Sequence, residues 1–193
     1  MIKDLDRSGY FGASDTKFIM RDNHQTKSWI EWWETKLGSN VNRVDNKYTR
    51  AGNIWEHPII QSIDDGIETD GQIIIEDKLL RVNYDGYKDG VIYEIKTHHV
   101  DNEFKVTKDY YGQCQVEMYV YQEMSEKWFL PPFSKLYLVH YPLYDEDYYT
   151  FDPIVDPNRL SHDEIEYDPK FIKDYLRRLK KLTKALKERK YPG

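Results

Sequence analysis

Two strand-like segments joined by a tight turn constrain the fold of this sequence more than any other feature. The first is the apolar run Leu79–Tyr84, and the second is Val91–Thr97. Between them stands Asp89-Gly90, a dipeptide that is typical of a hairpin turn. The pattern therefore predicts two antiparallel strands, with the residues that follow the first strand returned toward the second.

Charged residues lie where this hairpin ends. Side chains two positions apart share one face of a strand, so Glu94 and Lys96 point the same way, while Ile95 points into the core. Asp85 follows the first strand and can meet Glu94 across the hairpin. Two carboxylates with a free carbonyl between them suit a hard divalent cation, and a lysine beside them can hold or deprotonate an attacking water. The alternative is a strand pair that carries these groups as solvated cross-strand charges.

The other elements follow from periodicity and from capping residues. We predict helices from Ser14 to Met20, Trp29 to Leu37, Lys47 to Ser62, Thr107 to Glu126 and Pro169 to Lys190. Ser14 and Ser28 are the predicted N-caps of the first two helices. We expect Pro58 to kink or break the third helix. Tyr111, Gln115, Met118 and Gln122 form one stripe of the fourth helix, and Gln113 points elsewhere.

Further strands are predicted at Gln72–Ile75, Lys135–Tyr141 and, as a short one, Tyr148–Phe151. Residues 152–168 are acidic and rich in proline, so we expect a loop there. The order predicts an α/β fold (α+β mixed), a mixed central sheet flanked by helices. The chain is long enough for one domain, with a helical part (1–62), a sheet and helix (63–151), and a loop with a basic helix (152–193).

Charge is distributed unevenly along the chain. The net charge is −6, yet residues 173–190 hold nine Lys or Arg and two acids, a net +7. This basic helix either faces nucleic acid or is simply solvated. The single cysteine, Cys114, excludes a disulfide framework and any cysteine-built zinc or iron–sulfur site. The polar start Met1–Arg7 and the lack of long apolar runs lead us to expect a cytoplasmic protein without a membrane span.

The first motif is a turn-rich segment at residues 7–15, which precedes the helix that Ser14 is expected to cap. A helix N-terminus offers free N–H groups, so this segment is a candidate phosphate site. An ordinary capped helix is the alternative.

Four motifs, in order, resemble the lambda exonuclease/YqaJ-like family of phage recombination nucleases, which belongs to the PD-(D/E)XK superfamily. They are Arg7-x-Gly9-x-Phe11-x-Ala13-Ser14-Asp15, Gly52-x-x-x-Glu56, Asp85-Gly86 with Glu94-x-Lys96, and Tyr110-x-x-Gln113-x-Gln115-x-x-Met118-x-Val120. The resemblance spans residues 7 to about 121 and implies the restriction-endonuclease-like core of that superfamily.

The resemblance also implies a metal site. Asp85, Glu94 and the backbone carbonyl of Ile95 would bind two Mg²⁺ or Mn²⁺ ions, and Glu56 would hold metal through a water. Lys96 would orient and activate the attacking water.

The remaining implied roles concern substrate and partners. Gln115 would position the catalytic lysine or the substrate, and Arg7 and Ser14 would bind the 5′-terminal phosphate. Family members degrade one strand of linear duplex DNA from 5′ to 3′ and hand the other to a single-strand annealing protein. A homo-oligomer is implied, with a trimeric ring in the best-known member. Two other functions remain open: another PD-(D/E)XK endonuclease, and a catalytically silent phage protein that binds a host protein.

Overall fold

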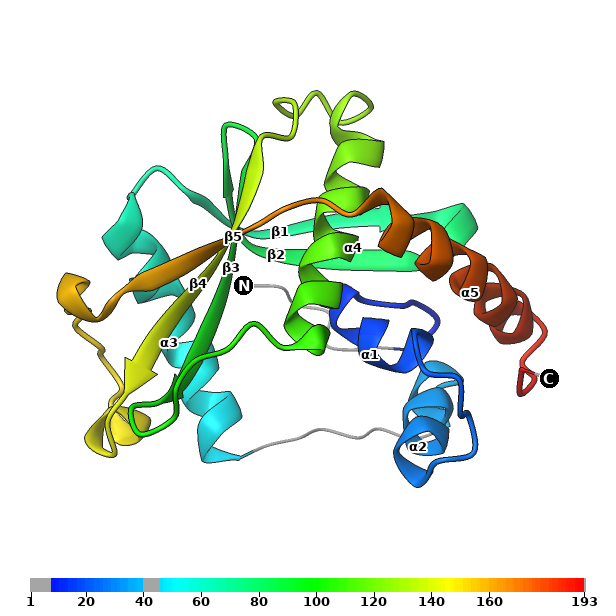
Figure 1. Cartoon of the computed structure of the whole chain (residues 1–193), viewed down its shortest axis with the longest axis horizontal. Coiled ribbons are helices and arrows are strands. Elements are labelled where there is room, and N and C mark those ends of the chain that lie inside the picture. Colours follow the sequence, from blue (N-terminus) through cyan, green and yellow to red (C-terminus); the bar gives the residue numbers. More distant parts are fainter. Residues whose placement is uncertain (1–7, 40–45, 193) are drawn as a thin grey trace.

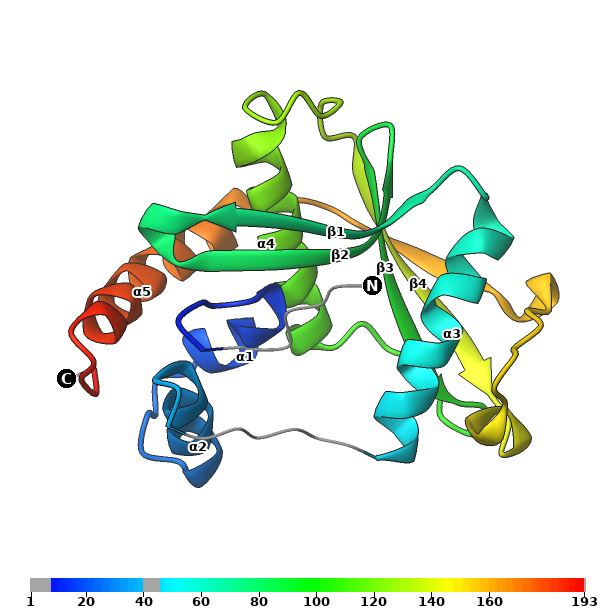
Figure 2. The ribbon, with the colours of Figure 1, turned by 180° about the vertical axis from the view of Figure 1, so that it is seen from behind.

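A five-stranded mixed sheet with helices on both faces forms the centre of the molecule (Figures 1 and 2). The computed structural model describes residues 8–39 and 46–192. The helices are α1 (Thr16–Ile19), α2 (Lys27–Lys36), α3 (Lys47–Ile63), α4 (Lys108–Ser125) and α5 (Pro169–Lys187). The strands are β1 (Glu68–Ile75), β2 (Leu80–Lys88), β3 (Val91–His99), β4 (Lys135–Leu143) and β5 (Ser161–Ile165). Short 3₁₀ helices are η1 (Ala13–Asp15), η2 (Glu76–Lys78), η3 (Glu146–Tyr149) and η4 (Pro157–Arg159).

The strand order is β1-β2-β3-β4-β5, and only β3 and β4 are parallel. A parallel pair needs a crossover, which α4 supplies. The β2–β3 ladder is short: it pairs Gly86 with Tyr93, Tyr87 with Ile92 and Lys88 with Val91. Beyond Gly86, β2 stays with β1 while β3 stays with β4, so the sheet forks (Figure 1).

Each face of the sheet has its own apolar core. The larger core joins β1, β2, α4 and α5 with three buried tryptophans of α2, Trp29, Trp32 and Trp33. The smaller core lies under α3, where Trp55, Ile59 and Ile60 pack with Ile95 of β3. The fork in the sheet is therefore held between α4 on one face and α3 on the other.

The predicted order of helices and strands is confirmed, and the predicted mixed sheet with it. Several details needed correction. α2 is capped by the side chain of Thr26 rather than by Ser28, whose Oγ accepts a hydrogen bond from Arg21. Ser14 lies inside η1 and caps no helix. α3 does not end at Pro58, because Trp55 before it and Ile59 after it are buried in the same core.

The end of the sheet was also mispredicted. Tyr148–Phe151 is not a strand: Glu146–Tyr149 is the 3₁₀ helix η3. The fifth strand, β5, falls in the segment predicted to be a loop. β5 is an edge strand whose first four residues are exposed, so its sequence lacks the alternation of a half-buried strand. Backbone pairing with β4, which the sequence does not display, holds it in place.

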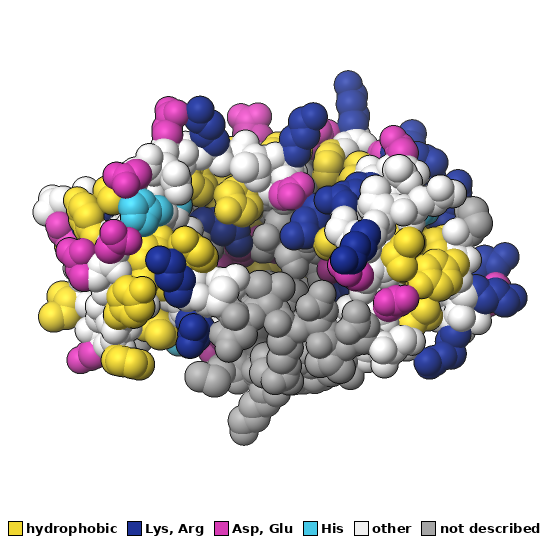
Figure 3. Space-filling model, turned by 90° about the horizontal axis from the view of Figure 1, so that it is seen from below, with side chains coloured by type: hydrophobic (Ala, Val, Ile, Leu, Met, Phe, Trp, Pro, Cys, Tyr) yellow, Lys and Arg dark blue, Asp and Glu magenta, His cyan; other side chains and the backbone are white. Residues whose placement is uncertain are grey.

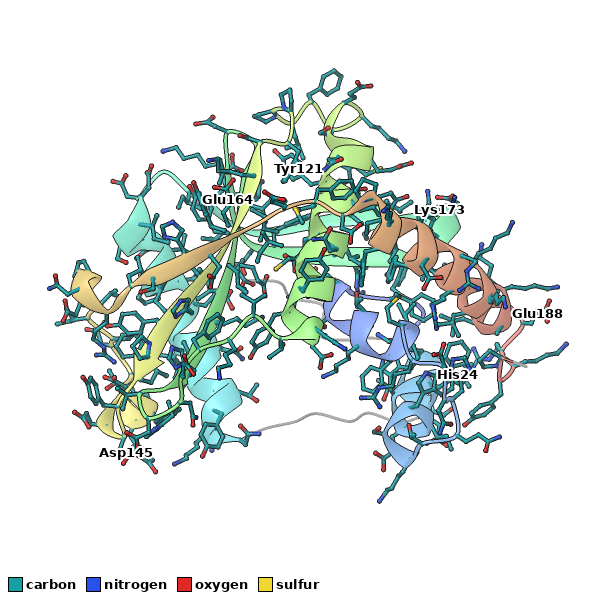
Figure 4. All side chains as sticks on the ribbon, viewed as in Figure 1. His24, Tyr121, Asp145, Glu164, Lys173 and Glu188 are labelled. Carbon is teal, nitrogen blue, oxygen red and sulfur yellow. The ribbon has the colours of Figure 1, made fainter. Side chains whose placement is uncertain are left out.

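The two ends of the molecule differ in surface chemistry. Asp145 lies at one end of the molecule and Glu188, which follows α5, at the other (Figure 4). Lysine and arginine side chains gather at the second end (Figure 3). The Asp145 end also exposes Tyr149, Phe151 and Ile154. None of the helices within the described ranges is long and apolar enough to cross a membrane.

One helical glycine sets the distance between α1 and α4. A Cβ at Gly112 would lie 2.8 Å from Cγ2 of Thr16, whereas a Cβ at Gly52 of α3 would meet its nearest heavy atom, Oγ1 of Thr97, at an ordinary 3.6 Å. We expect Gly112→Ala to lower the free energy of unfolding by about 1–3 kcal/mol through overpacking. Gly52→Ala should raise it by about 0.5–1 kcal/mol, because alanine favours helix. Urea unfolding of both variants tests this, and equal stabilisation would contradict the close α1–α4 contact.

Candidate active site

The fork between β2 and β3 brings the two predicted carboxylates together. The ladder ends at the pair Gly86–Tyr93, so Asp85 and Glu94 are the next residues on the two diverging strands. Oδ2 of Asp85 accepts a hydrogen bond of 2.8 Å from the backbone N–H of Ile95. The N–H and C=O of one strand residue point to the same edge, so the carbonyl of Ile95 also faces the opening.

Glu94 is the hub of the polar contacts at this opening. Its side chain is buried, and its Oε1 accepts hydrogen bonds from Nζ of Lys96 and, at 2.6 Å, from Nε2 of Gln113. Lys96 also lies over the ring of Tyr110, 5.4 Å from its centroid. Glu94 and Lys96 thus share one face of β3, as predicted, and Asp85 of β2 is bonded to the backbone N–H of the residue between them.

Further carboxylates surround this centre. Glu117 of α4 is completely buried, and its Oε1 accepts a 2.9 Å hydrogen bond from Gln113. Burial, reinforced by the charge of Glu94, raises the pKa of Asp85 and of Glu117 well above the usual range. Burial would lower the pKa of Lys96, but the charges of Glu94 and Asp85 outweigh this and raise it. The lysine is therefore a fixed positive charge among carboxyl groups that are costly to ionise without a cation.

Glu56 reaches the site from α3, on the other face of the sheet. Burial and the charge of Glu94 raise the pKa of Glu56. Its neighbour His57 places Nε2 at 3.3 Å from Oδ2 of Asp70. Ligand atoms of Glu56, His57 and Asp70 lie within 4.8 Å of one another, a group that could hold a metal ion. The structure therefore offers oxygen donors on both sides of β3.

A pocket of about 190 Å³ opens on the α4 side of Asp85. Its wall includes Ser14 of η1 together with Lys36, Arg81, Gln113 and Glu117. Ser14 is thus placed beside the carboxylates although it caps no helix. Arg7, its predicted partner in phosphate binding, lies outside the described residues.

A buried ion pair fixes the turn that carries Ser14. Nζ of Lys36 lies 2.5 Å from Oδ2 of Asp15, and both side chains are almost fully buried. The same carboxylate accepts hydrogen bonds of 2.7 Å from Nε1 of Trp32 and from the backbone N–H of Gly12. α2 therefore holds η1 through one charged group.

The predicted placement of Gln115 is corrected. Its amide is fully buried and turned toward the segment before α5: Nε2 donates to the carbonyl of Glu166, and Oε1 accepts from the N–H of Asp168, both at 2.7 Å. Gln113 points away from Gln115, as expected, and it is Gln113 that contacts Glu94. Residues 114–121 of α4 are all buried, so this part of the helix has no exposed face. The apolar stripe that includes Gln115 therefore does not show which side of the helix faces the site.

Three contributors were missed from the sequence: Gln113, Glu117 and the pair Lys36–Asp15. The spacing of Gln113 and Glu117, four residues apart, does place them on one helix face. A glutamate between the apolar residues Val116 and Met118 is a signal that could have been followed. Nothing in the sequence indicates that Lys36 meets Asp15.

Solved exonuclease structures share this fold. An alkaline exonuclease (LHK-Exo) from Laribacter hongkongensis superposes with a TM-score of 0.65 at 15% identity, over 94% of this chain and 89% of that one. A phage related exonuclease from Haemophilus somnus 129PT gives 0.66 at 17% identity, over 93% and 94%. LHK-Exo in complex with dAMP gives 0.64 at 16%, over 94% and 89%.

Searches of family models and of curated proteins found no match. The structural neighbours agree with the resemblance seen in the sequence motifs, and at these identities they establish the fold.

Proposed function

We propose that this protein is a metal-dependent exonuclease that degrades linear double-stranded DNA from the 5′ end. The observation that carries the proposal is the convergence of Asp85, Glu94 and Lys96 at the fork of the sheet. The shared fold of an alkaline and a phage related exonuclease supports it. The biological role would be resection of DNA ends for a single-strand annealing protein in phage-type recombination, in the host cytoplasm if the chain is phage-encoded.

The donor set fits Mg²⁺ or Mn²⁺. Hard divalent cations take carboxylate and carbonyl oxygens, and Asp85, Glu94 and the carbonyl of Ile95 face the same opening. Four carboxyl groups, from Glu56, Asp85, Glu94 and Glu117, surround Lys96. When all four are ionised they carry −4, and together with the lysine the net charge is −3. Two divalent ions would offset that charge and would stabilise the charge that develops on the phosphate oxygens.

The side chains divide the remaining work between them. Lys96 is held by Glu94, so its ammonium group can donate a hydrogen bond that orients the attacking water. Glu56, which approaches from the α3 side, would hold a metal-bound water there. Gln113 fixes the orientation of Glu94 and takes the role that we first assigned to Gln115.

The pocket beside Asp85 suits the phosphate end of a strand. Ser14 offers a hydroxyl and Arg81 supplies positive charge to the same wall, where the charge of Lys36 is paired with Asp15. We propose that this pocket receives the 5′-terminal phosphate, with Arg7 as a further contact. A binding site for the terminal phosphate of a strand favours an exonuclease over an endonuclease of the same superfamily. We further propose a homo-oligomer, which would keep the enzyme on its DNA.

Digestion of labelled DNA tests the proposal. We expect Mg²⁺-dependent release of nucleotides from linear duplex, faster with a 5′-phosphate than with a 5′-hydroxyl, and none from covalently closed circles. Cleavage of closed circles would favour the endonuclease. No cleavage of any substrate with Mg²⁺ or Mn²⁺, together with tight binding of a host protein that survives mutation of Asp85, Glu94 and Lys96, would favour the silent binding protein.

The two glutamines of α4 provide a paired test of the site. Gln113→Leu removes hydrogen bonds to two buried carboxylates, and we expect the rate of nucleotide release to fall about 10- to 100-fold, with a loss of about 1–3 kcal/mol in the free energy of unfolding. Gln115→Leu leaves two buried backbone groups unpaired, so the free energy of unfolding should fall by about 1–3 kcal/mol with activity retained. Initial rates and urea unfolding measure both effects. The opposite pattern would restore Gln115 to the catalytic site.

A further inference from the structure

We infer that Glu117 of α4 is itself a ligand of a divalent cation, bound on the pocket side of Asp85. The inference deepens the proposed metal-dependent function and rests on it. None of the sequence motifs assigns a role to Glu117. Its side chain is buried in the middle of α4, where it cannot serve as a solvated surface charge.

The first argument is an unpaired oxygen. The side chain of Glu117 is 0% exposed. Its Oε1 accepts a hydrogen bond from Gln113, but its Oε2 has no hydrogen-bond partner among the described residues. An unsatisfied buried polar group costs about 1–3 kcal/mol, and more when it is charged. This oxygen therefore needs either a proton or a cation.

The second argument is that no basic side chain of the described residues is paired with Glu117. Among residues 8–39 and 46–192, no lysine, arginine or histidine forms an ion pair with Glu117. Lys96 is bonded to Glu94, and Lys36 is bonded to Asp15. Arg81 lines the same pocket as Glu117, but it forms no ion pair with that carboxylate.

The third argument is space. Glu117, Asp85 and Gln113 line the same pocket of about 190 Å³. One water takes up about 30 Å³ of liquid volume, so a small cation and several waters fit there. Mg²⁺ keeps several waters and is commonly bound by one or two carboxylates. Asp85 and Glu117 would supply those two, while Gln113 holds Glu117 and Glu94 in fixed orientations from one amide.

The alternative is that Glu117 is a neutral acid buried for packing alone. The isosteric variant Glu117→Gln separates the two cases, because glutamine reproduces the neutral acid but binds a cation poorly. The amide of Glu117→Gln could form a new hydrogen bond that obscures the comparison. Glu117→Met has a side chain of similar size without an amide, so it removes this ambiguity. Glu126→Gln, at the exposed end of the same helix, is the matched control.

The experiment is titration with Mn²⁺, followed by the electron paramagnetic resonance signal of free Mn²⁺, with thermal unfolding in EDTA and in Mn²⁺ for each variant. We expect Glu126→Gln to bind Mn²⁺ as the original protein does. Glu117→Gln and Glu117→Met should lose or weaken one site at least tenfold, should melt higher than the original in EDTA, and should gain less from Mn²⁺.

Unchanged stoichiometry and affinity in both Glu117 variants would overturn the inference and leave the proposed function intact. No Mn²⁺ binding by the original protein, with Asp85→Asn indistinguishable from it, would overturn the metal-dependent function as well. The two failures are therefore distinct.

Discussion

Replacing Lys96 by methionine is expected to lower the rate of DNA hydrolysis by about 100- to 1,000-fold, the range for a lost hydrogen-bond donor in a catalytic site. The ammonium of Lys96 is the only lysine nitrogen bonded to Glu94 within the described residues. Methionine keeps the apolar stem and removes the charge. Steady-state rates on linear duplex, with Mg²⁺ saturating, measure the effect.

The same substitution at Lys88 is the control. Lys88 lies on β2 in the same hairpin, but its Nζ pairs with Asp64 at 2.7 Å and is partly exposed. Lys88→Met should keep a rate within about threefold of the original, as expected for a partly exposed ion pair. A Lys96→Met enzyme with more than a tenth of the original rate would remove the lysine from the mechanism.

The second large effect concerns stability. Lys36→Met should lower the free energy of unfolding by about 3–5 kcal/mol, because it leaves Asp15 buried without its cation. Both side chains of that pair are at most 8% exposed, and their charged atoms lie 2.5 Å apart. Urea unfolding followed by tryptophan fluorescence measures this loss. Trp32 is a suitable probe because it donates a hydrogen bond to the same carboxylate of Asp15.

The same substitution at an exposed lysine of α2 is the control. Lys27 pairs with Glu31 at 3.8 Å and is 89% exposed, so Lys27→Met should change stability by less than about 0.5 kcal/mol. Equal losses in the two variants would mean that the helix, rather than the buried pair, is responsible. A loss below 1 kcal/mol for Lys36→Met would contradict the role of the pair in fixing η1.

Local patterns predicted the fold well where the chain interacts with its sequence neighbours. Asp89-Gly90 predicted the hairpin, and Thr107 predicted the start of α4. The side-chain oxygen of Thr107 accepts a hydrogen bond from the N–H of Tyr110. β5 escaped prediction because an exposed edge strand carries no periodicity, and its partner β4 lies some twenty residues away.

The residues of the site were likewise predictable only where local sequence patterns position them. Asp85, Glu94 and Lys96 were predictable because strand parity and one turn bring them together. Gln113 and Glu117 were not, because every face of α4 in this stretch is buried and only the packed sheet selects which face meets Glu94. The contact of Lys36 with Asp15 depends on how α2 docks, which no local signal fixes.

The three rungs between β2 and β3 have a mechanical consequence. Asp85 lies on β2, which continues beside β1 beyond Gly86, and Glu94 lies on β3, which continues beside β4. Any ion held by both carboxylates would therefore tie together two strands that share no backbone pairing at that point. The charge of the ion, rather than the sheet, would set the separation of the two edges of the opening.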